Sequence, residues 1–533
     1  MKNRTNWILA TVPLVFLLAL LVAPALRLLV EGGQLSVWEP VLDSYLRWRL
    51  GWSFLQAALT CALALGLGLP VAWVLARFEF AGRSVVLHAL MLPFVVPTLV
   101  AAMGVLSLMG PQGVLRALGG PDLQGSPWLL IYGNLFFNLC LVVRAATEAL
   151  GQVSASRVAA ARTLGAAPWR VFWRIEWPST LPWLMSALCL VFLYCFSGFG
   201  LALLLGGQEY ATVEVEIYTL VAHELQLAQA GSLALWALAL TSVVALAYAV
   251  IERHLSTPAR ADIVTRRRPQ GWRQWVGVWA ALVVLALFCA APLLAIVWRT
   301  VAVGGPAWSV LIDATTLTAL WNSLRFTVLA VALATGLGLA HALAARRSLL
   351  LRTLAFLPFV VSPVMVAFGL LLLYPQWTAS FGLLVCAYAL LAYPFVAKSL
   401  AAGLDSVPVH LMQAARTLGA TPWHVFLRVT LPLLRPALRR GMAFAAATAV
   451  GEFAATLFLS RPEWATLTTL VYEYMGRPGT ANSDAALVLA CLLMALALLA
   501  FALIEWSAPA SPPQRRSSAS VAVGHPAREF RRA

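Results

Sequence analysis

Lysine is almost absent from this chain of 533 residues, in which Lys2 and Lys398 are the only two. Neither lysine follows a glycine, so the phosphate-cradling sequence GxxxxGK[ST] cannot occur. The chain also lacks an HExxH zinc motif, a nucleophile elbow and a histidine pair at metal-ligand spacing. These absences exclude an ATPase domain within the chain and predict no catalytic residue, bound cofactor or metal. An integral-membrane enzyme remains an alternative without a motif to support it.

Charged residues are also scarce, at 11% of the chain, whereas a soluble protein carries about 25%. Hydrophobic residues make up 61%, and the mean hydropathy is +0.85. Such a chain cannot bury its apolar surface in one soluble core, so the lipid bilayer must solvate much of it. The seven cysteines lie within apolar runs and form no CxxC, which predicts packing residues and not a disulfide framework or a zinc site.

Apolar runs long enough to cross a bilayer recur along the whole chain, since a spanning helix needs about 20 residues. We therefore expect an all-α polytopic membrane protein with about twelve transmembrane helices. The runs lie at 7–29, 52–75, 86–109, 127–149, 181–205, 232–252, 275–298, 321–345, 353–374, 380–401, 436–460 and 486–506. The first run is too long for the apolar region of a cleaved signal peptide, which favours an uncleaved first helix.

The net charge of +16 does not indicate a nucleic-acid partner, because the basic residues lie between apolar runs and not on one folded face. If the N-terminus is cytoplasmic, most arginines fall in cytoplasmic segments, as the positive-inside rule requires. We therefore expect both termini in the cytoplasm. Residues 253–273 predict a cytoplasmic linker between two halves, 1–252 and 274–506, and residues 507–533 predict a disordered tail.

Three short sequences each occur twice: AARTLGA at 160–166 and 414–420, LPFVV at 92–96 and 357–361, and GLGL at 66–69 and 336–339. Around AARTLGA an offset of 254 residues holds without a gap from Leu150/Leu404 to Tyr218/Tyr472. The chain thus has two homologous halves of six spans. An even number of spans makes the halves parallel repeats, related by an axis along the membrane normal. Both copies of AARTLGA fall between the fourth and fifth span of their half, on the cytoplasmic side.

Each copy predicts a short helix–turn–helix projection. Gly165 and Gly419 suit the left-handed position that ends a helix, and Pro168 and Pro422 suit the first turn of the next one. Thr421 is a plausible N-cap of that second helix. Two such projections on one side predict a paired docking site for a partner with two-fold symmetry, and the alternative is a pair of helices lying in the lipid interface.

Further features of the projections are predicted from spacing. Val158, Ala161 and Leu164 lie about one helical turn apart, as do Met412, Ala415 and Leu418, so each first helix has a small apolar face. We expect Pro178 and Pro432 to break the chain before it enters the membrane.

The segments VAAARTLGAAPWRVFWRIEWPSTL and LMQAARTLGATPWHVFLRVTLPLL resemble the cytoplasmic loop of binding-protein-dependent ABC importer permeases. In that family the loop is the coupling helix, which sits in a cleft of the ATP-hydrolysing subunit. The resemblance implies coupling loops at 150–180 and 404–434 whose docking residues are Ala160, Ala161, Arg162, Gly165, Trp169, Pro178, Ala414, Ala415, Arg416, Gly419, Trp423 and Pro432. The glutamate that usually begins the family signature is replaced by Ala159 and by Gln413, so no charge interaction is carried over.

The resemblance also implies the partners and the place of the protein. We expect two copies of a separate ATP-binding subunit, an extracytoplasmic solute-binding protein and the bacterial inner membrane. Whole-chain features over roughly residues 40–506 are similar to the fused, two-half permeases for thiamine; they include LDSYLRW at 42–48, GPQGVL at 110–115 and FSGFGLALLLGG at 196–207. The solute is then thiamine or its phosphates, with ferric iron or another small solute as alternatives. An ion-coupled secondary transporter is an alternative of a different class.

Glu452 is the main candidate for contact with the solute, because ionisable groups within the membrane are costly and mark functional sites by default. Thiamine carries a permanently positive thiazolium ring, which a carboxylate and the nearby aromatic residues Tyr194, Phe199 and Phe453 would suit. The alternative is that Glu452 pairs locally or holds its helix near a gate.

Other charged groups allow simpler interpretations. Arg144 and Glu148 are four residues apart and are expected to pair on a helix. The acidic segment that contains Glu209, Glu214, Glu216 and Glu224 either meets the binding protein or forms a solvated face.

Overall fold

The computed structural model describes residues 2–33, 38–255, 266–346 and 348–506, and every regular element in these ranges is a helix. The prediction of an all-α polytopic protein is confirmed. Ten helices are long and apolar enough to cross a membrane, and one bent pair could form an eleventh span. The predicted tail and the centre of the predicted linker, residues 256–265, lie outside the described residues.

The helices before the linker follow in this order: α1 (Lys2–Leu17), α2 (Ala23–Gly32), α3 (Glu39–Leu42), α4 (Ser44–Arg77), α5 (Arg83–Ala89), α6 (Leu92–Val95), α7 (Thr98–Met109), α8 (Val114–Ala117), α9 (Pro127–Gly151), α10 (Ala155–Thr163), α11 (Pro168–Val171), α12 (Trp177–Phe196), α13 (Phe199–Leu205), α14 (Val213–Ala222) and α15 (Leu227–Leu255). Two short π-helical segments, Leu18–Val22 and Phe172–Glu176, join α1 to α2 and α11 to α12.

The helices after the linker are α16 (Trp272–Leu285), α17 (Ala291–Ala302), α18 (Gly305–Trp308), α19 (Ala314–Ala345), α20 (Leu349–Leu354), α21 (Pro363–Leu373), α22 (Phe381–Ser406), α23 (Val409–Thr417), α24 (Pro422–Val425), α25 (Leu431–Val450), α26 (Ala454–Leu459), α27 (Leu467–Gly476) and α28 (Thr480–Trp506). Further π-helical segments lie at Ala286–Ala290 and Phe426–Thr430, and short 3-10 turns precede α19, α21, α22 and α27.

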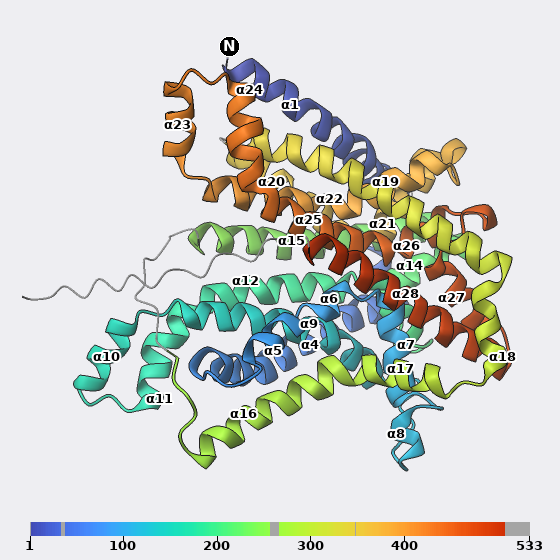
Figure 1. Cartoon of the computed structure of the whole chain (residues 1–533). Coiled ribbons are helices and arrows are strands. Elements are labelled where there is room, and N and C mark those ends of the chain that lie inside the picture. The colour runs from blue at the N-terminus through green and yellow to red at the C-terminus, as the bar shows by residue number, and fades with distance from the viewer. Residues whose placement is uncertain (1, 34–37, 256–265, 347, 507–533) are drawn as a thin grey trace, which may run out of the picture.

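The same three-helix bundle is built in each half. In the first half α4 packs against α9 and α12, and in the second half α19 packs against α22 and α25. Figure 1 shows the two bundles one above the other, with the second-half bundle at the top. These helices are the long apolar segments of the repeat, so the internal homology of the sequence appears as a repeated packing arrangement.

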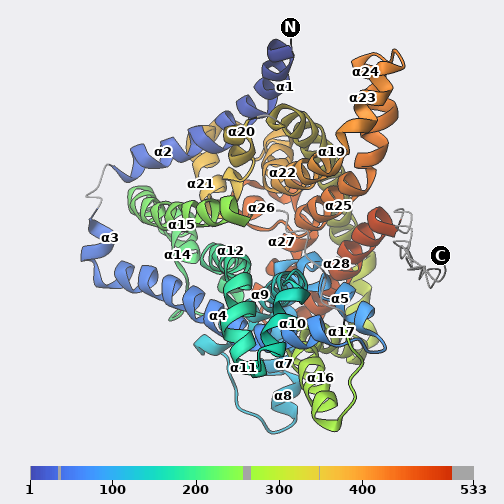
Figure 2. The same ribbon diagram turned by 90° about the vertical axis from the view of Figure 1, so that its left-hand side faces the viewer.

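The first helices of each half pack on the other half. Helix α1 packs on α19, and α2 lies between α15 of the first half and α21 of the second. Correspondingly, α16 packs on α4 and α17 packs on α7. Figure 2 shows α1 and α2 running along the second-half bundle while α16 and α17 lie beside the first-half helices. The first helices of each half therefore pack against helices of the other half.

Several predicted spans are interrupted near the centre of the molecule. The run at 86–109 is broken between α6 and α7, where Pro97 lacks the N–H that a continuous helix needs. The runs at 181–205 and 436–460 are broken at Ser197–Gly198 and at Gly451–Phe453. In the run at 353–374 the two helical parts meet at an angle of 92°. Such breaks are tolerated at membrane depth where the freed backbone groups are buried in protein or line a cavity.

A hydrogen bond attaches the segment that follows each broken helix to the long first helix of the same bundle. Ser53 Oγ of α4 accepts a hydrogen bond from Val213 N at 2.7 Å, and Ser323 Oγ of α19 accepts the same bond from Leu467 N at 2.9 Å. These serines occupy equivalent positions in the repeat, 270 residues apart (323 − 53), like the two GLGL sequences. The hydrogen bond is therefore a common element of both halves.

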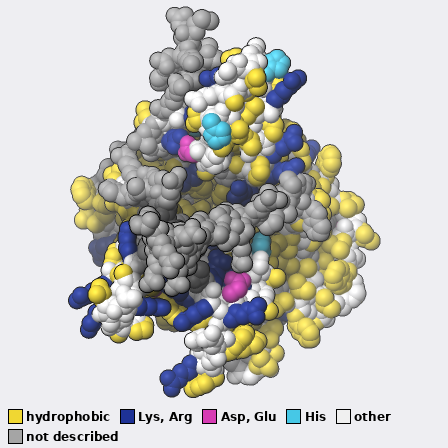
Figure 3. Space-filling view, turned by 60° about the vertical axis from the view of Figure 1, so that its left-hand side comes forward, with side chains coloured by type: hydrophobic (Ala, Val, Ile, Leu, Met, Phe, Trp, Pro, Cys, Tyr) yellow, Lys and Arg dark blue, Asp and Glu magenta, His cyan; other side chains and the backbone are white. Residues whose placement is uncertain are grey.

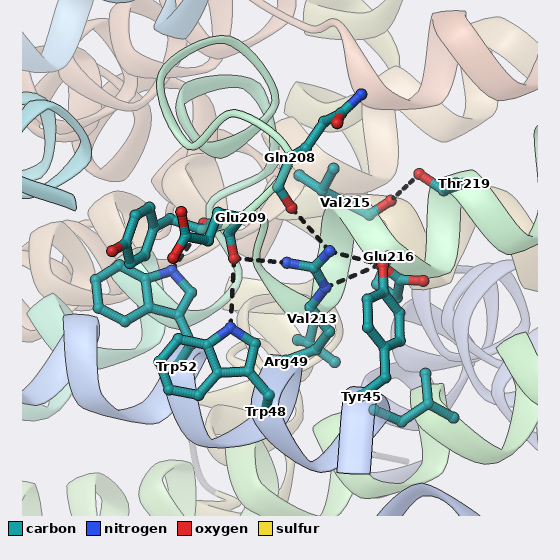
Figure 4. Close-up of polar contacts among 12 residues, drawn as sticks. Tyr45, Trp48, Arg49, Trp52, Gln208, Glu209, Val213, Val215, Glu216 and Thr219 are labelled. Carbon is teal, nitrogen blue, oxygen red and sulfur yellow. Dashed lines mark hydrogen bonds and ion pairs between the residues drawn. The ribbon is translucent and has the colours of Figure 1, made fainter. Parts of the chain in front are cut away.

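The first half adds a buried ion pair to this attachment (Figure 4). Arg49 Nε lies 3.1 Å from Glu216 Oε2, and the guanidinium also donates to the carbonyls of Gln208 and Glu209. Arg49 and Glu216 are only 5% and 3% exposed. The expectation that the acidic segment forms a surface is therefore wrong for Glu216 and for Glu214, which is fully buried, because each carboxylate has a polar partner inside the protein.

We expect Glu216→Ala to lower the free energy of unfolding by about 3 kcal/mol, because it leaves the buried Arg49 without its counter-charge. Unfolding of the purified protein in mixed micelles by a denaturing detergent would measure this change. The matched control is Glu148→Ala, whose partner Arg144 lies at 3.2 Å on the same helix with both side chains largely exposed, and this variant should unfold as the wild type does. A loss of the same size in both variants would contradict the assignment of Arg49–Glu216 as the stabilising pair.

Candidate functional site

A cavity of about 300 Å³ lies between the two halves, where the interrupted helices meet. The breaks at Val96–Pro97, Ser197–Gly198 and Gly451–Phe453 all contribute to its wall. Both halves line it, with Phe94, Val96, Pro97, Thr98, Asn134, Phe137, Asn138, Leu193, Tyr194, Ser197, Gly198, Phe199, Gly200 and Leu201 from the first and Pro358, Phe359, Val361, Ser362, Pro363, Leu391, Phe395, Ala447, Thr448, Gly451, Glu452, Phe453 and Ala454 from the second. Discontinuous helices around a central site are typical of transporters.

The four residues that the sequence singled out for solute contact all line this one cavity. Phe199 and Phe453 hold equivalent positions in the repeat, and their rings stack across the interface with centroids 5.7 Å apart. Tyr194 packs on Phe359, so its ring also bridges the two halves. Tyr218 and Tyr472, again an equivalent pair, flank the stacked phenylalanines. The aromatic residues thus form a nearly symmetric wall.

Glu452 breaks that symmetry, since Gly198 occupies the equivalent position in the first half. The carboxylate is 7% exposed, and its Oε1 accepts a hydrogen bond of 2.9 Å from Ala455 N at the start of α26. Among the described residues no basic side chain pairs with it. Glu452 thus accepts a hydrogen bond at the start of a short helix and also lines the cavity, and its contact with the solute stays a prediction.

Sequence reasoning missed a polar network on α9. Asn134 Nδ2 donates to Gln56 Oε1 at 2.8 Å, and Asn138 Nδ2 donates to the Asn134 carbonyl at 2.9 Å. Gln56 in turn donates to the Cys195 carbonyl just before the break in α12. The signal was present, because two asparagines four residues apart in a spanning run share one helix face and are costly unless partnered.

A second feature that sequence reasoning missed joins the two halves. Glu214 of α14 accepts a hydrogen bond from Ser362 Oγ of the second half, and the two oxygens are 2.6 Å apart. Ser362 lies on the cavity wall at the start of α21. The acidic residue was noticed in the sequence, but its partner is 148 residues away and belongs to the other half.

The charge of the cavity has one sign. Glu452 is an acidic lining residue, and no lysine, arginine or histidine is among the residues that line the wall. Seven of the lining residues are aromatic, namely Phe94, Phe137, Tyr194, Phe199, Phe359, Phe395 and Phe453. Aromatic faces and a carboxylate both attract cations, so the lining suits a positively charged, partly apolar solute.

The two copies of AARTLGA form two projections at the same end of the molecule. Figure 1 shows α10–α11 protruding at the lower left and α23–α24 at the upper left, and Figure 3 shows basic side chains distributed over this end. Gly165 and Gly419 have φ angles of +79° and +82°, which confirms the predicted left-handed turn. Thr421 Oγ1 accepts from His424 N, which confirms the predicted N-cap.

The docking residues inferred from the resemblance lie on these projections. Ala160, Arg162, Trp169 and their second-half equivalents Ala414, Arg416 and Trp423 are exposed. Ala161 and Ala415 are half-buried against the second helix of each projection, beside the buried Val158 and Met412. Pro178 is exposed and Pro432 is half-buried.

Two expectations about the projections are wrong. Leu164 and Leu418 do not belong to the packed face, because they sit in the turn and are 87% and 88% exposed. Pro178 and Pro432 do not break the chain, since each lies in the first turn of a long helix that continues directly from a π-helical segment. A missing N–H is tolerated in a first turn, where no intrahelical acceptor is required.

The first projection is attached to its half by an ion pair that is not repeated at the equivalent residues of the second half. In the first half Glu176 pairs with Arg77 at the end of α4, and both side chains are mostly buried. The equivalent of Glu176 in the second half is Thr430, and the more exposed pair of Arg352 and Asp405 at 2.7 Å instead joins α20 to α22. The end of α4 also forms backbone hydrogen bonds with Arg267, so the described end of the linker lies beside the first projection.

Two copies of a sequence model described as "Binding-protein-dependent transport system inner membrane component" match the chain at residues 64–257 and 332–511. Together they cover most of the chain, one copy in each half. The protein therefore belongs to this family of importer permeases, whose members work with ATP-binding and solute-binding subunits. It is a multi-pass protein of the inner membrane, and membership of this family decides against an ion-coupled secondary transporter.

Similar proteins include permeases that match this chain over most of their own length. The thiamine transport system permease protein ThiP of Escherichia coli (strain K12) is 28% identical over 504 residues, covering 89% of this chain and 91% of the relative. ThiP of Haemophilus influenzae (strain Rd) is 27% identical over 509 residues with the same coverage. A shorter match, 33% identical over 168 residues, is the molybdenum transport system permease protein ModB of H. influenzae, and it covers 28% of this chain.

Proposed function

We propose that this chain is the membrane-spanning subunit of an ATP-driven importer for thiamine or its phosphates. The observation that carries the proposal is the cavity between the halves, which combines an acidic residue with seven aromatic side chains and has no basic residue on its wall. Thiamine is an aromatic organic cation, and the relatives matched over 89% of the chain are named for its transport. A ferric ion prefers several hard oxygen ligands, which a lining dominated by aromatic and aliphatic groups does not offer.

ATP hydrolysis is assigned to a separate subunit, two copies of which would bind the projections α10–α11 and α23–α24. This assignment is supported by the lack of any GxxxxGK[ST] sequence and by the nearly identical geometry of the two glycine turns. Exposed leucine and tryptophan side chains on both projections provide the apolar surface that a protein partner would cover. The permease itself would bind no nucleotide or other cofactor.

The projections, and with them both termini, are placed in the cytoplasm on the strength of the positive-inside rule. An extracytoplasmic binding protein would then deliver the solute to the opposite end of the molecule. Closure of the two ATPase copies would rock the halves and open the cavity alternately to each side of the membrane.

Uptake by proteoliposomes that contain all subunits should require ATP and be insensitive to a protonophore.

We expect Gly165→Val and Gly419→Val to abolish thiamine uptake and to reduce recovery of the ATPase subunit with the permease. A β-branched residue at φ near +80° strains the turn, although no atom blocks a Cβ at either position. Co-purification and uptake in reconstituted vesicles would measure both effects, while the amount of permease in the membrane should not change.

The matched controls separate strain in the turn from bulk. Gly151→Val adds the same side chain where a Cβ also meets open space but φ is not positive, and it should retain uptake to within about twofold. Gly165→Asn should retain most of the uptake as well, because asparagine tolerates the left-handed region. If the ATPase still binds both valine variants and transport continues, the projections are not the docking site.

Glu452→Gln tests the cavity. Glutamine keeps an oxygen that can accept from Ala455 N, so α26 stays capped while the negative charge is lost. We expect the KM for thiamine uptake to rise roughly tenfold, with little change in the ATPase rate of the assembled complex. The exposed Glu224→Gln is the control and should leave both quantities unchanged. An equal loss of uptake and ATPase rate would instead assign Glu452 to a gate or to structure.

A further inference from the structure

The Asn138 side chain, which lines the cavity, carries an acceptor atom without a hydrogen-bond partner. The residue is 3% exposed and lines the cavity from α9. Its Nδ2 donates to the Asn134 carbonyl at 2.9 Å and to Cys195 Sγ at 3.2 Å. Because a backbone carbonyl can only accept, these contacts fix which end of the amide is the NH₂ group. The Oδ1 atom is therefore the remaining end, and it is buried without a hydrogen-bond partner.

Ser197 carries a second buried polar atom that has no hydrogen-bond partner. It lies at the break between α12 and α13, two residues beyond Cys195, and it also lines the cavity. Its Oγ has no hydrogen-bond partner in the described part of the chain. Buried polar atoms are nearly always paired, so the unpaired atoms of these two cavity-lining residues are candidates for contact with a ligand.

The internal repeat shows that the fold does not require this polar group. At the positions equivalent to Asn134 and Asn138, offset by 254, the second half has Tyr388 and Ala392. Those residues are buried in a bundle with the same packing of long helices. The second half thus forms its bundle with alanine at the place of Asn138, and a purely structural role of the asparagine is not needed to explain the fold.

We propose that Asn138 Oδ1, together with the Ser197 hydroxyl, accepts the N–H groups of an amino-substituted heteroaromatic cation bound in the cavity. The proposal rests on the proposed function and deepens it, since it assigns the specificity for the uncharged part of the solute to the first half. Glu452 of the second half would face the positive charge. Thiamine has this division, with an exocyclic amino group on its pyrimidine ring and the permanent charge on its thiazolium ring.

The arrangement gives the two halves separate roles in recognition. A carboxylate attracts any cation, and aromatic faces accept any flat ring, so neither would select for an amino group. A site whose buried acceptor is satisfied only by a donor rejects an analogue that lacks the donor far more strongly than an apolar wall can. Asn138 would therefore act as a specificity-determining residue and not as a general binding residue.

The test pairs one change in the protein with one change in the ligand. The permease–ATPase complex is placed in lipid nanodiscs without the binding protein, so that only the permease selects. Equilibrium binding is measured for radiolabelled thiamine and, by competition, for the analogue in which hydrogen replaces the pyrimidine amino group. The wild type should bind thiamine about tenfold more tightly than the analogue. Asn138→Ala should lose about tenfold affinity for thiamine and leave the affinity for the analogue unchanged.

Ser107→Ala is the matched control, because Ser107 Oγ is likewise buried without a hydrogen-bond partner, but Ser107 is not among the residues that line the cavity. It should preserve the tenfold preference for thiamine. If Asn138→Ala weakens both ligands equally, or if the wild type binds them equally while importing thiamine normally, the inference is overturned and the proposed function stands. If the complete wild-type system imports no thiamine at all, the proposed function itself fails and the inference with it.

Discussion

The backbone of a membrane protein must satisfy its own N–H and C=O groups, because lipid offers no partners. This constraint explains why every regular element of the described chain is a helix and why the interruptions at Val96–Pro97, Ser197–Gly198 and Gly451–Phe453 gather around the cavity between the halves. Each interruption exposes polar backbone and brings a side chain such as Ser197 or Glu452 to the wall. The place where the fold departs from continuous helices is the place where a polar solute could be held.

The two halves are most alike at the projections and least alike at the cavity. The turns at Gly165 and Gly419 have almost the same φ angle, and the side chains around them show the same burial in both copies. Around the cavity, by contrast, Glu452 corresponds to Gly198, and the cavity-lining Asn138 corresponds to Ala392, which is not among the lining residues. A two-fold partner keeps its two contact surfaces equal, whereas a small solute without symmetry gains from a site in which each half contributes different groups.

The sequence alone was sufficient for features that depend on local chemistry. Glycine at a left-handed position, the Thr421 cap and the long apolar helices follow from residue type and spacing, and they are confirmed. The cavity residues could be singled out because a lone carboxylate within an apolar run is unusual.

Features that depend on contacts distant in sequence could not be predicted. Glu214 and Glu216 look like members of an acidic surface in the sequence. Their partners inside the protein, Ser362 and Arg49, are far away along the chain. Prolines showed where helices could break but not which would: Pro97 coincides with a break, whereas Pro178 and Pro432 begin continuous helices. The sequence could not reveal that Asn138 Oδ1 lacks a hydrogen-bond partner, because this depends on which atoms surround it in the folded protein.

The exchanged first helices affect how the chain is made. Helix α17 emerges from the ribosome when α7, on which it packs, already exists, but α1 must wait for α19. The interval between the end of α2 at Gly32 and the start of α19 at Ala314 corresponds to about 15–60 s at the usual rate of synthesis. During that time α1 has only lipid and temporary neighbours to cover it. Helix α1 therefore enters the membrane well before the helix on which it packs has been synthesised.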